Sequence, residues 1–298
     1  MSLPRAAANP ERVLHGHLRY APHLGYRPPF EPLFACSARA ADVLSQIDYA
    51  ADSGFAGVLH PAARRFTADE QAHAGELIAR RGLAAGCVLY TTFDKLRSTV
   101  WGDDGVEARR TIADELRAAI DAARRIGSTR LAIVGGADET KPLPIQHAAF
   151  IRNLAHAADL AEAAGMILCL ETINRERVPG MLLHHLTDAL KVVRAVDRPS
   201  VRLIFDTAHV QAMDFDAAAQ LESAWDAIEI VQIADHPGRN EPGTGSVEFE
   251  RLFGVLGARG YRGLVELEHG WRAPGAESER RGIATLQRLD AIAAAAAP

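Results

Sequence analysis

The sequence predicts a (β/α)8 barrel, in which eight parallel strands alternate with eight helices. One pattern recurs along the chain: an amphipathic stretch, a glycine or turn residue, and a short β-branched run that ends in polar residues. Eight such runs fit a chain of 298 residues, slightly longer than the roughly 250 residues that are typical of this architecture. No GxGxxG follows the first run and no P-loop is present, which disfavours a doubly wound open sheet.

Each expected strand is a β-branched run that turns polar at its end. With the turn residues beside them, the runs span residues 13–20, 52–60, 80–90, 124–136, 162–174, 197–209, 225–235 and 258–269. The glycines that precede several runs suit helix C-caps, where a residue in the left-handed conformation ends the helix. We therefore expect a helix to lead into each of these strands.

Helix-like stretches separate the expected strands. They cover residues 39–52, 67–80, 106–126, 145–164, 186–195, 217–225, 249–259 and 277–295. Because strand and helix alternate throughout, we expect a single barrel domain over residues 1–298, with residues 1–12 forming an irregular extension.

Composition and charge exclude several classes of function. Subtracting 38 acidic from 33 basic residues leaves a net charge of -5, which gives no general attraction to nucleic acid or to anionic membranes. The start lacks the apolar middle of a signal peptide, and no run approaches the roughly 18 apolar residues of a membrane span. The three scattered cysteines indicate reduced core residues. We expect a soluble, cytoplasmic protein, and the sequence leaves open whether it forms a homo-oligomer.

Four polar residues stand at the ends of the last four expected strands: Glu171, Asp206, Gln232 and Glu268. Active sites of such barrels lie at the carboxyl ends of the strands, and alternation places these four side chains on faces that would converge there. Three carboxylates brought together are unfavourable unless a cation offsets them, and an all-oxygen set suits Mg²⁺ or Mn²⁺. Any one of the four alone would be explained by helix capping or a surface ion pair.

Most histidines fall on expected helices, where a half-buried or solvated ring is the ordinary explanation. His209 differs, because it follows Asp206 by three residues and is close enough to contact the ion's ligands or a substrate. His60 ends the second strand and is expected to face the cavity. His17, in the first strand, is left open between core and site.

The segment after the seventh strand, VQIADHPGRNEPGTG, is too polar for a core and too rich in functional groups for a simple connector. We expect it to form a loop over the mouth, with rigid turns set by its prolines and glycines. Arg239 would offer a forked pair of donors to a substrate, with His236 as a further contact. Trp271, just past the last strand, is a third candidate for substrate contact.

Glu266 lies one layer deeper than Glu268 on the last strand. Arg202 lies on the matching face of the sixth strand. We expect these two residues to form a buried ion pair that supports the barrel.

The motifs LETINRERVPGMLL, FDTAHVQ, VQIADHPGRNEPGTG and GYRGLVELEH resemble those of hydroxypyruvate isomerases. These enzymes belong to the xylose-isomerase-like barrel superfamily, with ketose 3-epimerases, inosose-processing enzymes and an apurinic endonuclease branch. The likeness runs from about Gly25 and is strongest in the second half. It implies that the four strand-end residues are metal ligands, that Glu171 and Glu268 transfer protons, and that His209 and Arg239 contact substrate.

Three departures from the family pattern lie around the expected substrate pocket. Glu176 stands where the isomerases usually have arginine, and Arg175 and Arg177 flank it. The segment after Glu268 is longer by two residues, and Ser246 replaces the usual glutamate. These changes bear on the identity of the substrate more than on the chemistry.

The expected function is therefore that of a metal-dependent aldose-ketose isomerase of a small hydroxy-keto acid or sugar, with no organic cofactor. One glutamate would remove a proton, the metal would stabilise the enediolate, and a carboxyl group would return the proton. The reference reaction is hydroxypyruvate to tartronate semialdehyde. The closest alternative is a 3-epimerase or isomerase of a longer ketose or keto acid. A non-catalytic sugar-binding barrel and an apurinic endonuclease fit less well, the latter because Gln232 replaces a histidine of that branch.

Overall fold

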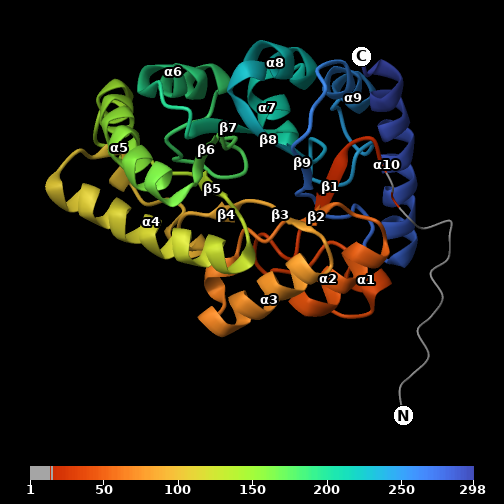
Figure 1. Cartoon of the computed structure of the whole chain (residues 1–298). Coiled ribbons are helices and arrows are strands. Elements are labelled where there is room, and N and C mark those ends of the chain that lie inside the picture. Colours follow the sequence, from red (N-terminus) through yellow and green to blue (C-terminus); the bar gives the residue numbers. More distant parts are fainter. Residues whose placement is uncertain (1–13, 15) are drawn as a thin grey trace.

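The structure is a computed structural model that describes residue 14 and residues 16–298. A ring of parallel strands lies at the centre and helices cover its outside (Figure 1). The strands are β1 (Arg19–Pro22), β2 (Gly57–Val58), β3 (Ala84–Ala85), β4 (Val88–Leu89), β5 (Arg130–Ile133), β6 (Ile167–Glu171), β7 (Val201–Asp206), β8 (Ile228–Ile233) and β9 (Leu264–Leu267). The predicted eightfold barrel is confirmed, because β3 and β4 are two pieces of one extended segment.

The strand order shows how the ring closes. Seven strands pair in the order β1-β9-β8-β7-β6-β5-β4, and β2 pairs with β3. Backbone hydrogen bonds from Ala56 N to Tyr20 O (3.0 Å) and from Leu59 N to Pro22 O (2.9 Å) join β1 to the segment of β2. The first strand therefore contacts both the second and the last.

Helices alternate with the eight strand segments, as the pattern predicts, and the last helix follows the last strand. They are α1 (Ala35–Ala38), α2 (Val43–Asp52), α3 (Ala68–Arg80), α4 (Val106–Ile126), α5 (Leu143–Ala164), α6 (Leu186–Val196), α7 (Thr207–Asp214), α8 (Ala217–Ala224), α9 (Phe249–Ala258) and α10 (Ala276–Ala296). Thr67 and Glu70 form a capping box at the start of α3. Gly127 and Gly165, with φ of 82° and 71°, end α4 and α5 in the left-handed conformation expected of these glycines. None of the described helices combines the length and the apolar character needed to cross a membrane.

Two differences from the predicted elements concern the ends of strands. The first strand begins at Arg19, whereas residues 13–20 were expected, so His17 precedes the strand instead of lying in it. The expected extension of residues 1–12 lies outside the described residues. Helix α7 follows β7 without a loop and was not predicted. Asp206 is its N-cap and accepts a hydrogen bond from His209 N at 2.9 Å.

Inside the ring, one layer of small and apolar side chains forms the floor beneath the strand ends. Its buried members come from six of the strand segments: Leu59, Cys87, Ala132, Cys169, Ile204 and Ile230. Small residues in this layer leave space above it, as expected for a barrel that carries a cavity at its carboxyl end.

Helix α10 holds the start of the first strand. The carboxylate of Asp290 accepts hydrogen bonds from Leu18 N at 2.8 Å, from His17 N at 2.6 Å and from Tyr20 Oη at 2.8 Å. The last helix therefore fixes the position of β1, which in turn pairs with β9 from Arg19–Leu264 to Pro22–Leu267.

Candidate active site

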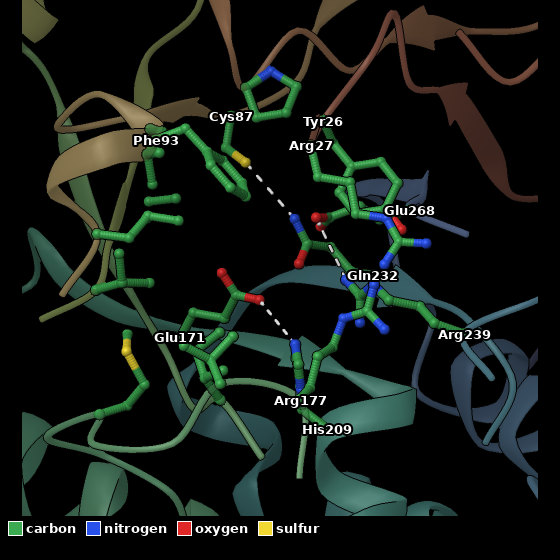
Figure 2. Close-up of a pocket in the computed structure, with 18 residues that line it drawn as sticks. Tyr26, Arg27, Cys87, Phe93, Glu171, Arg177, His209, Gln232, Arg239 and Glu268 are labelled. Carbon is green, nitrogen blue, oxygen red and sulfur yellow. Dashed lines mark hydrogen bonds and ion pairs between the residues drawn. The ribbon is translucent and has the colours of Figure 1, made fainter. Parts of the chain in front are cut away.

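A cavity opens at the carboxyl ends of the strands, and Figure 2 shows the side chains that line it. Nitrogen-bearing side chains gather on one side and Phe93 lies on the other. The polar lining residues are Tyr26, Arg27, Cys87, Glu171, Arg177, His209, Gln232, Arg239 and Glu268. The remaining wall is apolar and includes Leu96 and Met181, so the cavity is amphipathic.

Glu171 ends β6 and faces His209, which lies in the first turn of α7. His209 Nδ1 accepts a hydrogen bond from Asn174 N at 3.1 Å, so the proton of the neutral ring is on Nε2. Nε2 lies 3.7 Å from Glu171 Oε1 (Figure 2). Burial lowers the pKa of His209 to about 3, which keeps the ring neutral. The loop after β6 therefore orients the ring so that its N–H faces the carboxylate.

Asp206 and Glu268 share one arginine. Arg239 donates to Asp206 through both terminal nitrogens, at 3.0 Å to Oδ1 and 2.8 Å to Oδ2. Its Nη2 also lies 3.3 Å from Glu268 Oε1. Burial acts to raise the pKa of Asp206, but the charge of Arg239 together with the hydrogen bonds from Arg239 and His209 holds that pKa below its ordinary value. The forked donors expected to meet a substrate are therefore already held by Asp206.

Gln232 points into the cavity from β8. Its Nε2 donates to Glu266 Oε2 at 2.9 Å, while its Oε1 is buried and has no hydrogen-bonding partner among the residues that the structure describes. Glu266 also accepts from Cys87 N at 2.8 Å, and a Cβ on Gly86 would lie only 2.6 Å from Glu266 Oε1. The expected ion pair between Glu266 and Arg202 is wrong, because Glu266 is held by Gln232 and Cys87 and no ion pair joins the two among the described residues.

The carboxylates of the cavity repel one another in the absence of a cation. Burial raises the pKa of Glu171 well above its usual range, and the charges of Glu268 and Asp206 add to the effect. Burial raises the pKa of Glu268 to about 7. Arg239 pairs with Asp206 and Glu268, whereas Glu171 has only the neutral ring of His209 beside it, so a cation near Glu171 would relieve this repulsion.

The residues present fit a hard divalent cation. Ligand atoms of Glu171, Asp206 and His209 lie within 4.8 Å of one another. Gln232 Oε1 is a buried acceptor without a partner, and the lone pairs of Asp206 exceed the number that Arg239 occupies. Oxygen donors predominate, as Mg²⁺ and Mn²⁺ prefer. His209 was not predicted among the possible ligands.

The loop that carries Arg239 is organised by Asp235. The Asp235 carboxylate is buried and accepts hydrogen bonds from five backbone N–H groups. These belong to His236, Gly243, Thr244, Gly245 and Val247. Because the charge of Asp235 holds the loop from inside, Arg239 approaches Asp206 from a defined position.

Three candidate substrate contacts lie outside the lining of this cavity. His60 is buried, with its ring 5.2 Å from that of Phe66, and its neighbour Pro61 lines the cavity instead. His236 is half-buried in the Asp235 loop. Trp271 donates from Nε1 to Leu33 O at 2.6 Å and lines a second, neighbouring cavity.

Several lining residues have no counterpart among the sequence predictions. Tyr26 and Arg27 come from the loop after β1, and the Tyr26 ring lies between two guanidinium groups, 5.2 Å from Arg27 Cζ and 5.5 Å from Arg239 Cζ. Arg177 comes from the loop after β6. Its only sequence signal is the changed charge order at residues 175–177.

The comparison with protein families gives one match that spans most of the chain. The family model described as xylose isomerase-like TIM barrel matches residues 13–289.

Curated relatives are similar over parts of the chain. The hydroxypyruvate isomerase of Escherichia coli (strain K12) is 28% identical over 235 residues, which is 76% of this chain and 88% of that protein. The 2-oxo-tetronate isomerase of Cupriavidus necator is 31% identical over 160 residues, 52% of this chain and 60% of that protein. The second match therefore leaves two fifths of the relative uncovered.

Solved structures share the fold over nearly their whole length. A structure described as an AP endonuclease, family 2, from Brucella melitensis has a TM-score of 0.75 and 27% identity, covering 90% of this chain and 98% of that one. The 3-keto-D-glucoside 4-epimerase of E. coli has a TM-score of 0.73 at 20% identity, with 91% and 99% covered. The latter likeness concerns the fold alone.

Proposed function

This chain belongs to the xylose isomerase-like TIM barrel family, and we propose that it is a metal-dependent isomerase of a small hydroxy-keto acid or sugar. The expectation of an isomerase is confirmed by the curated relatives, which carry isomerase names. The observation that carries the proposal is that Glu171, Gln232 and Glu268 line one cavity, with the buried Asp206 beside them in contact with Arg239 of the same lining. The reference reaction is hydroxypyruvate to tartronate semialdehyde.

Glu171, Asp206, Gln232 and Glu268 would hold Mg²⁺ or Mn²⁺. When bound, such an ion polarises the adjacent carbonyl and hydroxyl oxygens of a substrate and makes the C–H bond between them acidic. Among the described residues Gln232 Oε1 has no hydrogen-bonding partner, and the carboxylates repel one another; both observations support this assignment.

Glu171 and Glu268 are proposed as the proton-transferring pair. One removes the proton from the hydroxyl-bearing carbon and the other returns a proton to the former carbonyl carbon. The hydroxyl proton passes to the former carbonyl oxygen, so the ketone and aldehyde positions exchange. His209 Nε2–H faces Glu171 at 3.7 Å and orients that carboxylate toward the cavity. Burial brings the pKa of Glu268 to about 7, so this group would hold or release a proton near neutral pH.

The apolar wall keeps bulk water from the reacting carbon. Phe93, Leu96, Val178 and Met181 contribute apolar surface to the lining of the cavity. Exclusion of water strengthens the electrostatic interactions in the cavity and protects a reactive intermediate from protonation by solvent.

The test is turnover of hydroxypyruvate by protein loaded with Mn²⁺, followed by NMR in D₂O. We expect loss of hydroxypyruvate together with incorporation of deuterium at carbon. Metal-free protein should show neither. Deuterium exchange that is equal with and without metal, or its absence from every short keto acid and ketose tested, would contradict the proposal.

A longer ketose or keto acid is the second candidate substrate. A second cavity adjoins the first and shares Tyr26 and Arg27 with it, so a longer molecule could extend from one into the other. Comparing kcat/KM for three-, four- and six-carbon substrates separates the two candidates. A preference for the longest would favour an isomerase or epimerase of larger substrates.

A further inference from the structure

Arg177 has no assigned role and lies in the cavity wall. It belongs to the loop between β6 and α6, and its backbone N–H donates to Asn174 Oδ1 at 2.8 Å. Asn174 in turn holds the ring of His209. Asn174 therefore fixes both the backbone of Arg177 and the ring of His209. The side chain of Arg177 lines the cavity (Figure 2).

The guanidinium of Arg177 lacks a partner. Its Nη2 is buried without any hydrogen-bond acceptor, and Arg177 takes part in no ion pair with a described residue. Burying a charged donor without an acceptor is strongly unfavourable, whereas pairing it with an anion recovers that free energy. The buried nitrogen therefore indicates a partner that the described residues do not supply.

The other charged groups nearby do not provide this partner. Asp206 and Glu268 are paired with Arg239. Glu176, which precedes Arg177 in the loop, is exposed and forms no ion pair with a described residue. Arg27 also lines the cavity without an ion pair and contacts only the Tyr26 ring among described aromatic residues. The cavity thus holds two cationic groups that its own acids leave free.

We propose that Arg177 binds a carboxylate of the substrate and makes the cavity selective for keto acids over neutral sugars of equal length. A guanidinium matches a carboxylate through two parallel N–H donors, which a lysine or an amide cannot reproduce. The inference rests on the proposed isomerase function and assigns to Arg177 the discrimination between keto acids and neutral sugars. It also gives a physical meaning to the altered charge order at residues 175–177.

The test compares Arg177→Gln with Arg175→Gln, an identical change at an exposed position in the same loop. Calorimetric titration uses two unreactive probes, glycerate and its neutral amide, glyceramide. Charge-assisted hydrogen bonds correspond to about 10- to 100-fold in affinity. We therefore expect Arg177→Gln to weaken glycerate binding by that factor while glyceramide binding stays within about twofold. Arg175→Gln should change neither.

Three results would overturn the inference. The first is that wild-type protein binds glycerate no more tightly than glyceramide. The second is that Arg177→Gln still binds glycerate more tightly than glyceramide. The third is that Arg175→Gln loses this preference as completely as Arg177→Gln does. Should Arg177→Gln fail to fold, Arg177→Lys replaces it and should recover only part of the preference.

Turnover separates this inference from the proposed function. Wild-type protein that isomerises hydroxypyruvate, with an unchanged KM in Arg177→Gln, would overturn the role of Arg177 and leave the function standing. Absence of turnover in wild type, together with a glycerate preference that Arg177→Gln removes, would overturn the function and leave the carboxylate site.

Discussion

Arg239 Nη2 lies between two acids, 2.8 Å from Asp206 Oδ2 and 3.3 Å from Glu268 Oε1. Both Arg239 and Asp206 are almost fully buried. The strand-end acids are thus held together by a residue from the loop after β8. The stability of the loop that carries Arg239 therefore depends on the charges of Asp206 and Glu268.

Removal of Arg239 should destabilise the metal-free protein. Arg239→Gln leaves Asp206 buried without its countercharge, and breaking such a buried pair costs about 3–5 kcal/mol. Urea unfolding after treatment with a chelator measures the change. Arg251→Gln is the matched control: its ion pair with Asp216 has side chains 48% exposed and should contribute under about 1 kcal/mol. Equal effects of the two substitutions would contradict the prediction.

Glu171→Gln should lower kcat by about 10² to 10⁴, the usual contribution of a positioned acid or base. The amide keeps the size of the side chain but cannot accept a proton from the substrate. Glu176→Gln, five residues further and exposed, is the control and should retain wild-type kcat. A Glu171→Gln variant with wild-type deuterium exchange would exclude this residue as a proton-transferring group.

Gln232→Leu should weaken Mn²⁺ binding. The substitution removes the unpartnered Oε1, and since outer-shell partners of a metal already contribute about 10- to 100-fold in affinity, a direct ligand should contribute at least as much. Titration of metal-free protein with Mn²⁺, followed by electron paramagnetic resonance, measures the affinity. The substitution also removes the hydrogen bond from Gln232 to Glu266. Unfolding curves of the metal-free wild type and variant therefore serve as the control for structural damage. Unchanged affinity would remove Gln232 from the ligand set.

Stability should fall as the pH is lowered from 6.5 toward 4, in part because of His60. Burial lowers the pKa of His60 to about 4, whereas the unfolded residue gains its proton near 6.5. Its contribution is therefore fully present above pH 6.5 and is lost progressively below it, at up to about 1.4 kcal/mol per pH unit. Burial places the pKa of His269 at about 4 as well, so the two effects add.

His60→Gln isolates that contribution, because an amide does not titrate. Urea unfolding at several pH values should give a shallower slope for this variant between pH 6.5 and 4. The same substitution at His156, whose ring already faces solvent, is the matched control. An identical slope in wild type and His60→Gln would show that the buried ring takes up its proton without cost to the fold.

The strand ends were predictable because alternation along a strand is a strict geometric rule. Glu171, Asp206 and Gln232 are each separated by two residues from a member of the apolar floor, Cys169, Ile204 or Ile230. A period of two therefore places them above that floor. The barrel followed from the same rule applied to eight segments.

Loop side chains were not predictable in this way. Arg239 was expected to face a substrate, yet the Asp235 network directs its fork to Asp206. Trp271 was expected at the pocket, but a hydrogen bond to Leu33 O holds it beside the second cavity. Such directions depend on turns and on partners distant in sequence, and neither leaves a periodic pattern.

The pairing of β1 with β9 has a consequence for synthesis of the chain. Residues 19–22 pair with the segment of β2 on one side, but their partner on the other side exists only when residues 264–267 have been made, and Asp290 completes the contact later still. A nascent chain emerging from the ribosome must therefore keep one unpaired strand edge until residues 264–267 have been synthesised.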